Sequence, residues 1–166
     1  MDKYIFLDID GVLNSNDWFE KNKDVDGFVE IDPSKLKLLK EIVNCTEAKI
    51  IFSSSWRSLG RRDDKPDNEI YTYLLNSLKQ FGLSISDHTP YLSQNRPREI
   101  REWLKKNCDI NNTRFISLDD DYRYSDYSQY GIEDCLIRAS FYEKNGGLQR
   151  RHVDKAIEIL NGEYMV

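Results

Sequence analysis

The chain has 166 residues, of which 39% are hydrophobic and 32% are charged, and its formal net charge is -5 at pH 7. This length suits one domain with a sizeable core, and the composition argues against both a disordered polymer and a membrane protein. The negative charge disfavours broad electrostatic adhesion to nucleic acid, although it leaves room for a local basic patch.

Strands and helices alternate from the start of the chain. Residues 3–9 form a continuous apolar run, which is typical of a strand buried on both faces. Residues 32–44 predict a helix, because Asp32 can cap its start and Pro33 suits the first helical position. Residues 48–56 predict a second buried strand that ends in hydroxyl side chains.

The same alternation continues to the end of the chain. The further predicted elements are a helix over 68–82, a strand around 83–86, a helix over 96–107, a strand over 114–121 and a helix over 149–162. No repeat and no Ser/Gly/Pro-rich linker divides them. This pattern predicts an α/β fold with a mainly parallel sheet and helices on both faces.

Polar side chains follow three of the predicted strands. The first strand ends in Asp8 and Asp10, the second in Ser53 to Ser55, and the last in Asp119 to Asp121. Right-handed crossovers bring the carboxyl ends of parallel strands to one edge of the sheet, so these side chains should meet there. Carboxylates gathered at one point repel one another, and Mg²⁺ with oxygen ligands is the simplest compensation.

Four motifs in this order resemble those of the haloacid dehalogenase-like (HAD) phosphohydrolases. They are "DIDGVLN", a strand ending in serine, a basic residue near a helix start and a strand ending in "LDDD". The segments "FSSSWR", "EIREWL" and "GLQRRHVDKAIEIL" resemble the HAD domain of Swiss-army-knife RNA repair proteins, so the resemblance extends over essentially the whole chain. It implies a three-layer Rossmann-like fold and a phosphatase that works with Mg²⁺ through an aspartyl phosphate.

The resemblance also implies roles for the aspartates. Asp8 would attack the phosphorus and become the transient aspartyl phosphate. Asp10 would protonate the leaving oxygen and then deprotonate the attacking water. A carboxylate oxygen of Asp8, the main-chain carbonyl of Asp10 and the side chain of Asp119 would hold the metal, with Asp120 as a further or water-mediated ligand.

Residues outside the aspartate pairs also receive candidate roles, and some of these roles have alternatives. Ser53 would donate a hydrogen bond to a phosphoryl oxygen, and Ser54 is the neighbouring candidate. Gly11 would permit the tight turn after the acid pair. Arg57 either belongs to a solvated basic loop or reaches further substrate phosphates.

The third motif offers an arginine where relatives often carry lysine. Arg96, followed by Pro97, would balance charge on the nucleophile and the phosphate, and Arg98 is the alternative. Arginine forks to two oxygens whereas lysine acts as a point charge, so the local geometry would differ from that of a lysine site.

We expect a single HAD-like phosphatase domain over residues 1–166, with a small flap, such as a hairpin, around 13–31 and a minimal cap or none. An open site suits a bulky substrate, such as a nucleic-acid end or a phosphoprotein, or requires a partner that closes it. The RNA-repair resemblance favours a polynucleotide or nucleotide phosphate. Four tyrosines either stack on bases or pack a loop against the domain, namely Tyr122, Tyr124, Tyr127 and Tyr130. The alternative is a non-catalytic module that binds a phosphate, a nucleic acid or a protein on the same fold.

Location and assembly are less constrained by the sequence. No stretch approaches about 18 consecutive apolar residues, so we expect a cytoplasmic protein without membrane attachment. The three cysteines lack CxxC spacing, which argues against a disulfide framework or a zinc site. The natural substrate, the phosphoryl acceptor and the oligomeric state stay open.

Overall fold

The computed structural model describes residues 1–54 and 69–162, and it is built around a five-stranded sheet in which every strand pair is parallel. The strand order across the sheet is β3-β2-β1-β4-β5. The strands are β1 (Asp2–Leu7), β2 (Lys49–Phe52), β3 (Ile85–His88), β4 (Thr113–Asp119) and β5 (Leu136–Arg138). The central position of β1 places the residues that follow Leu7 between the ends of β2 and β4.

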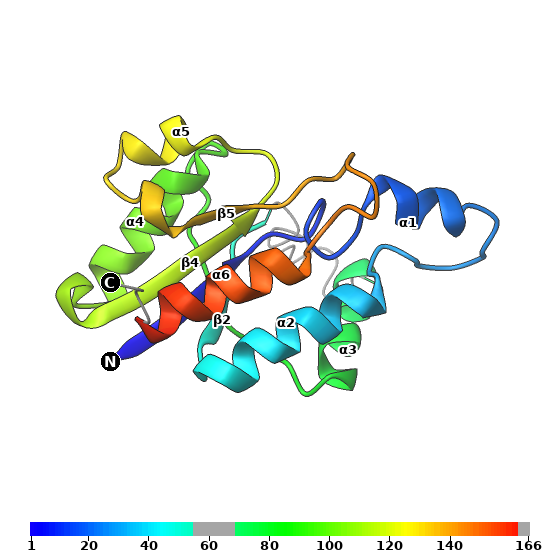
Figure 1. Cartoon of the computed structure of the whole chain (residues 1–166), viewed down its shortest axis with the longest axis horizontal. Coiled ribbons are helices and arrows are strands. Elements are labelled where there is room, and N and C mark those ends of the chain that lie inside the picture. The colour runs from blue at the N-terminus through cyan, green and yellow to red at the C-terminus, as the bar shows by residue number, and fades with distance from the viewer. Residues whose placement is uncertain (55–68, 163–166) are drawn as a thin grey trace.

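Helices cover both faces of this sheet (Figure 1). They are α1 (Asn16–Lys21), α2 (Pro33–Thr46), α3 (Glu69–Gln80), α4 (Arg96–Asn107), α5 (Tyr124–Ser128) and α6 (Arg150–Asn161), with 3-10 turns η2 (Ile110–Asn112) and η3 (Glu133–Cys135). Helices α2, α3 and α6 lie on one face, whereas α4 and α5 lie on the other. The predicted α/β class with three layers is therefore confirmed.

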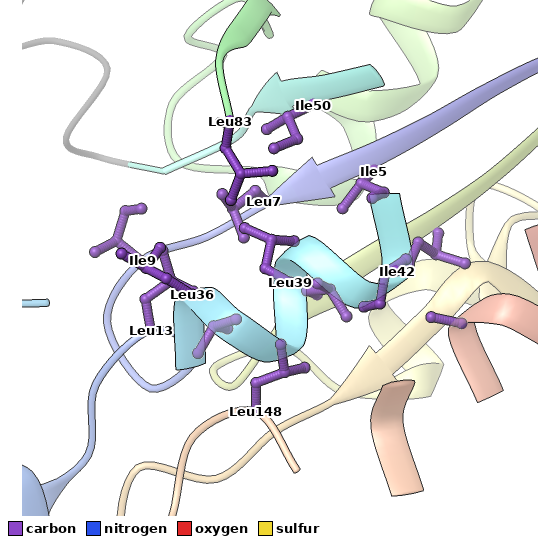
Figure 2. Packing of buried hydrophobic residues seen from close by; sticks show 14 of the residues in the cluster. Ile5, Leu7, Ile9, Leu13, Leu36, Leu39, Ile42, Ile50, Leu83 and Leu148 are labelled. Atoms are coloured by element: carbon purple, nitrogen blue, oxygen red, sulfur yellow. The ribbon is translucent and has the colours of Figure 1, made fainter. Parts of the chain in front are cut away.

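The alternation of side chains along β1 divides the core into two parts. Ile5 and Leu7 point into the larger cluster, where they pack against Leu36 and Leu39 of α2 (Figure 2). Phe6, between them in sequence, points into the cluster on the other face. Because strands alternate with a period of two, a strand buried on both faces must be apolar at every position, which explains the unbroken apolar run. Each such side chain contributes about 1.5–3 kcal/mol when fully buried.

Trp103 of α4 is the centre of the second cluster. Its ring meets Tyr4 and Phe6 edge to face, at centroid distances of 5.0 and 5.5 Å. The indole Nε1 also donates a hydrogen bond of 2.8 Å to Asp87 Oδ2 in β3. These contacts fix the position of α4 on the sheet, and the first turn of this helix carries Arg96.

The start of α2 follows its predicted chemistry. Asp32 caps the helix by accepting a 2.9 Å hydrogen bond from the Ser34 amide, and Pro33 occupies the first turn. The helix ends at Thr46, and the cap residue Glu47 after it adopts a left-handed conformation with φ of 60°. Helix α2 therefore runs two residues beyond the predicted end at residue 44.

Three short elements differ from the sequence-based expectation. The span 13–31 contains helix α1, where a hairpin had been one expectation, and this helix begins where Ser15 Oγ accepts a 3.1 Å hydrogen bond from the Trp18 amide. Helix α5 and strand β5 are short elements that the sequence pattern did not predict. None of the helices within 1–54 and 69–162 is long and apolar enough to cross a membrane.

Candidate active site

The ends of β1 and β4 bring two aspartates side by side. The two strands pair in parallel with Leu7 opposite Leu118, and the Asp8 amide donates a 3.1 Å hydrogen bond to the Leu118 carbonyl. Asp8 and Asp119 follow directly, and their side chains are buried, with relative exposures of 8% and 0%. Asp8, Asp119 and Asp120 each offer a carboxylate oxygen, and these oxygens lie within 4.8 Å of one another.

Arg96 places a positive charge against this cluster. Its Nη1 lies 2.5 Å from Asp119 Oδ2 and 3.7 Å from Asp8 Oδ2. The guanidinium also lies 5.5 Å from the centre of the Tyr122 ring, a distance suited to a cation–π contact. Arg98, two positions further into the first turn of α4, is exposed. Of the two candidate cations, the structure therefore brings Arg96 to the aspartates.

The buried carboxyls hold protons more strongly than free aspartates do. Burial, followed by repulsion from Asp119, raises the pKa of Asp8 from 3.8 to about 8, while the charge of Arg96 acts in the opposite direction. Burial, followed by repulsion from Asp119 and Asp121, raises the pKa of Asp120 to about 7. One guanidinium does not neutralise three carboxylates, so a further cation at this point would favour their ionised forms.

The donor atoms at this point suit a hard divalent cation. Oxygen ligands from carboxylates are the usual protein ligands of Mg²⁺. Asp119 already uses both of its oxygens, since Oδ2 contacts Arg96 and Oδ1 accepts a 2.9 Å hydrogen bond from the Asp121 amide. Asp120 is less buried than Asp119. Asp8, Asp119 and Asp120 each offer an oxygen to this point, and Asp119 also holds Arg96, so the implied metal-binding role of each aspartate stays a prediction.

The turn after β1 carries Asp10 and is stabilised by hydrogen bonds of the Asn14 side chain. Asn14 Nδ2 donates hydrogen bonds to Asp10 Oδ1 at 3.0 Å and to the Glu30 carbonyl at 2.8 Å, and Asn14 Oδ1 accepts one of 2.8 Å from the Gly11 amide. Asn14 is fully buried. The sequence pattern alone gives Asn14 no role, although an amide at the end of the apolar run "GVL", four residues after Asp10, is a signal that could have marked it.

Position 11 requires glycine because of its backbone conformation and because Asp120 lies close to it. Its φ is +80°, a region that side-chain-bearing residues rarely adopt. A Cβ atom at this position would lie 1.9 Å from Asp120 Oδ2. The absence of a side chain at Gly11 therefore lets the end of β4 approach the turn after β1.

Ser53 follows β2 and lies beside the end of β1. Its amide donates a 2.9 Å hydrogen bond to the Leu7 carbonyl, and its hydroxyl accepts one of 3.4 Å from Thr89 Oγ1. Ser53 and Ser54 are each 1% exposed, so burial does not choose between them. Arg57 lies outside the residues that the structure describes.

A cavity of about 390 Å³ opens onto this cluster. Its lining includes the carboxylates Asp8, Asp10 and Asp120 and the cation Arg96. The other lining residues are Tyr91, Gln94, Glu99, Asp121 and Tyr122. The carboxylates, the cation and an aromatic wall therefore share one hollow at the carboxyl edge of the sheet.

The tyrosines that follow β4 divide between packing and exposure. Tyr127 is fully buried, and its hydroxyl lies 2.7 Å from Ser117 Oγ. The Tyr130 hydroxyl accepts a 2.9 Å hydrogen bond from Asn95 Nδ2 at the start of α4. Tyr124 is 53% exposed, whereas Tyr122 lines the cavity. Packing against the domain thus accounts for Tyr127 and Tyr130.

Comparison with known proteins gives a family match. The model of the HAD domain in Swiss Army Knife RNA repair proteins matches residues 4–153, which include every aspartate of the cluster, Asn14 and Arg96. Neither the curated proteins nor the solved structures gave a match.

Proposed function

The chain belongs to the family of HAD domains found in Swiss Army Knife RNA repair proteins, and on that premise we propose that it hydrolyses phosphate monoesters with Asp8 as the nucleophile. The observation that carries the proposal is the cluster of Asp8, Asp119 and Asp120, whose oxygens lie within 4.8 Å of one another with Arg96 against them. Such a concentration of buried charge lowers stability and is characteristic of functional sites.

The first chemical step belongs to Asp8. One carboxylate oxygen attacks the phosphorus, the bond to the ester oxygen breaks, and the carboxyl becomes an aspartyl phosphate. Asp8 must be ionised to attack, and Arg96, 3.7 Å away, favours the ionised form. Asp10 gives its proton to the leaving oxygen, in an orientation fixed by the 3.0 Å hydrogen bond from Asn14.

The second step returns the enzyme to its starting state. Asp10 takes a proton from a water molecule, the oxygen of that water attacks the phosphorus, and the bond from phosphorus to Asp8 breaks. Inorganic phosphate leaves and the Asp8 carboxylate is restored. Ser53 and Arg96 donate hydrogen bonds to the phosphoryl oxygens, over which the negative charge spreads in both transition states.

We propose Mg²⁺ as the cofactor, which the side chains of Asp8, Asp119 and Asp120 and the main-chain carbonyl of Asp10 would hold. When bound, it neutralises carboxylate charge and lets an anionic nucleophile approach an anionic ester. The carboxylate donor set and the net negative charge of the cluster support this choice. We propose nucleotide or polynucleotide-end phosphates as substrates, which the RNA repair context of the family supports.

Phosphate release tests this function directly. We expect the wild-type protein to release phosphate from an aryl phosphate and from a 3'-phosphorylated oligonucleotide with Mg²⁺ and to stop in EDTA. Asp8→Asn should be inactive, and Asp24→Asn, which removes an exposed carboxylate outside the cavity, should stay active. Folded wild-type protein that binds the oligonucleotide but releases nothing would favour the non-catalytic binding module instead.

A further inference from the structure

The cavity above Asp8 has an aromatic rim. Tyr91, Gln94 and Tyr122 line the same hollow as the aspartates. Tyr91 is 54% exposed, whereas Asp8 is 8% exposed. The reacting carboxylate therefore lies deep in the hollow, and the Tyr91 ring lies at its solvent side.

Two contacts connect the loop that carries Tyr91 to the site cation. Glu99 Oε2 accepts a 2.7 Å hydrogen bond from the Leu92 amide, and Glu99 Oε1 lies 3.7 Å from Arg96 Nε. The Tyr122 hydroxyl donates a hydrogen bond to the Gln94 carbonyl, and the ring of Tyr122 lies against the Arg96 guanidinium. The same side chains that surround Arg96 thus fix the position of the rim.

The backbone of this loop is also in an unusual conformation. Ser93 and Gln94 both have positive φ, at 54° and 61°. Residues other than glycine occupy this region at an energetic cost, and they persist there only where surrounding contacts hold them. Two successive residues of this kind, directly before the first turn of α4, indicate that the rim has a defined shape without a ligand.

The charges around the cavity decide what kind of contact can bind a nucleic acid here. The cavity is lined by Asp8, Asp10, Glu99, Asp120 and Asp121, and Arg96 is the cation among its described lining residues. The whole chain is also negative, at -5. Among the residues that the structure describes, the cavity therefore offers no further cation to neighbouring phosphates, and its aromatic rings are the uncharged surface that can add affinity beyond the terminal phosphate.

We propose that Tyr91 is a substrate-binding residue whose ring stacks on the nucleobase of the nucleotide that carries the scissile phosphate. The proposal rests on the phosphatase function and specifies its substrate as a nucleotide or a nucleic-acid end with a base. The sugar separates base from phosphate, so a phosphate at Asp8 leaves the base at the exposed rim. In phosphotyrosine the ring is bonded to the phosphate oxygen and would lie deeper in the hollow. A cavity of about 390 Å³ is near the lower end of ligand pockets, which suits one nucleotide.

Paired substrates test the stacking contact. We would measure kcat/KM on a 3'-phosphorylated oligonucleotide and on the same oligonucleotide with an abasic terminal nucleotide. The ratio of the two values should fall about 5- to 140-fold in Tyr91→Ala, the range expected for one base–aromatic stack. Tyr91→Phe keeps the ring and should keep the ratio. Tyr124→Ala, which removes a tyrosine of similar exposure (53%) outside this cavity, should keep it as well.

Each other outcome has a definite meaning. An unchanged ratio in Tyr91→Ala overturns the stacking proposal. If the ratio is unchanged because kcat/KM falls equally on the base-bearing and abasic substrates, the loss indicates a structural role for Tyr91. A faster reaction with a phosphotyrosine peptide than with the oligonucleotide overturns the assignment of the nucleobase.

A separate control distinguishes failure of the proposed phosphatase function from failure of the stacking proposal. Wild-type protein that releases no phosphate from glycerol phosphate, aryl phosphate or either oligonucleotide would contradict that function alone. The anisotropy of both labelled oligonucleotides bound to Asp8→Asn protein, with and without Tyr91→Ala, would then decide the stacking contact. Tighter binding of the base-bearing strand that Tyr91→Ala removes supports the contact, and equal binding of both strands overturns it.

Discussion

Asp8→Asn should stabilise the metal-free protein while it removes the nucleophile. Burial and the charge of Asp119 raise the pKa of Asp8 from 3.8 to about 8. Between about pH 4 and pH 8, the folded state therefore keeps a proton that the unfolded state has already released. The free energy of unfolding consequently falls as the pH rises through this window. Asparagine has a similar shape and carries no charge, so it does not lose this free energy.

The size of the effect follows from the shift of about four pKa units. At about 1.4 kcal/mol per unit, the upper limit is about 5 kcal/mol at pH 8. Asp119 and Asp120 share protons with Asp8, and water enters the open cavity, so we expect about 2 kcal/mol. For a chain of this length that corresponds to a rise in Tm of about 4–8 °C.

Denaturant unfolding in EDTA, at pH 5 and at pH 8, measures this difference. Asp8→Asn should exceed the wild type in stability at pH 8, with a smaller excess at pH 5. The control Asp24→Asn alters an exposed carboxylate outside the cavity and should change stability by less than about 0.5 kcal/mol. A lower stability of Asp8→Asn than of the wild type at pH 8 in EDTA would refute the reasoning.

Three other substitutions test the contacts of the site. Arg96→Met leaves Asp119 buried without its cation and should lower the free energy of unfolding in urea by about 3–5 kcal/mol. Arg98→Met, at an exposed position, should change it by less than about 0.5 kcal/mol. Equal effects of the two substitutions would contradict the assignment of Arg96 as the cation of the site. Gly11→Ala meets the Asp120 carboxylate and should weaken Mg²⁺ binding about 10- to 100-fold in a calorimetric titration, and an unchanged affinity would count against this approach. Asn14→Ala releases Asp10 and should lower kcat about 100-fold with little change in KM, while a change in KM alone would argue against orientation of the acid.

The parts of the fold that depend on long apolar patterns were predictable. Strands β1 and β2 each bury consecutive apolar residues, and β4 buries Ile116 and Leu118 just before its aspartates. Strand β5 has three residues, Leu136–Arg138, which is too short for a periodic signal. Helix α1 has six residues, which are too few to show a helical pattern of apolar residues. Its position depends on the contacts of Ser15 and Trp18.

The choice between neighbouring residues in the site depends on three-dimensional contacts. Arg96 and Arg98 are equivalent candidates in sequence, and the direction of the first turn of α4 brings Arg96 to Asp119. Asp119 and Asp120 are adjacent in sequence, and hydrogen bonds of 2.9 Å or less occupy both oxygens of Asp119. Asn14 lies in the first motif, but its hydrogen bond to Asp10 appears only once the turn is built.

Trapping of the phosphorylated residue tests the central claim most directly. We would mix the wild-type protein with Mg²⁺ and a 3'-phosphorylated oligonucleotide, quench the reaction during turnover, reduce with borohydride and sequence the peptides by mass spectrometry. An aspartyl phosphate is reduced to homoserine, so the proposed mechanism predicts homoserine at position 8 and none in Asp8→Asn. Continued phosphate release with homoserine at another aspartate, or with no homoserine, would contradict Asp8 as the nucleophile.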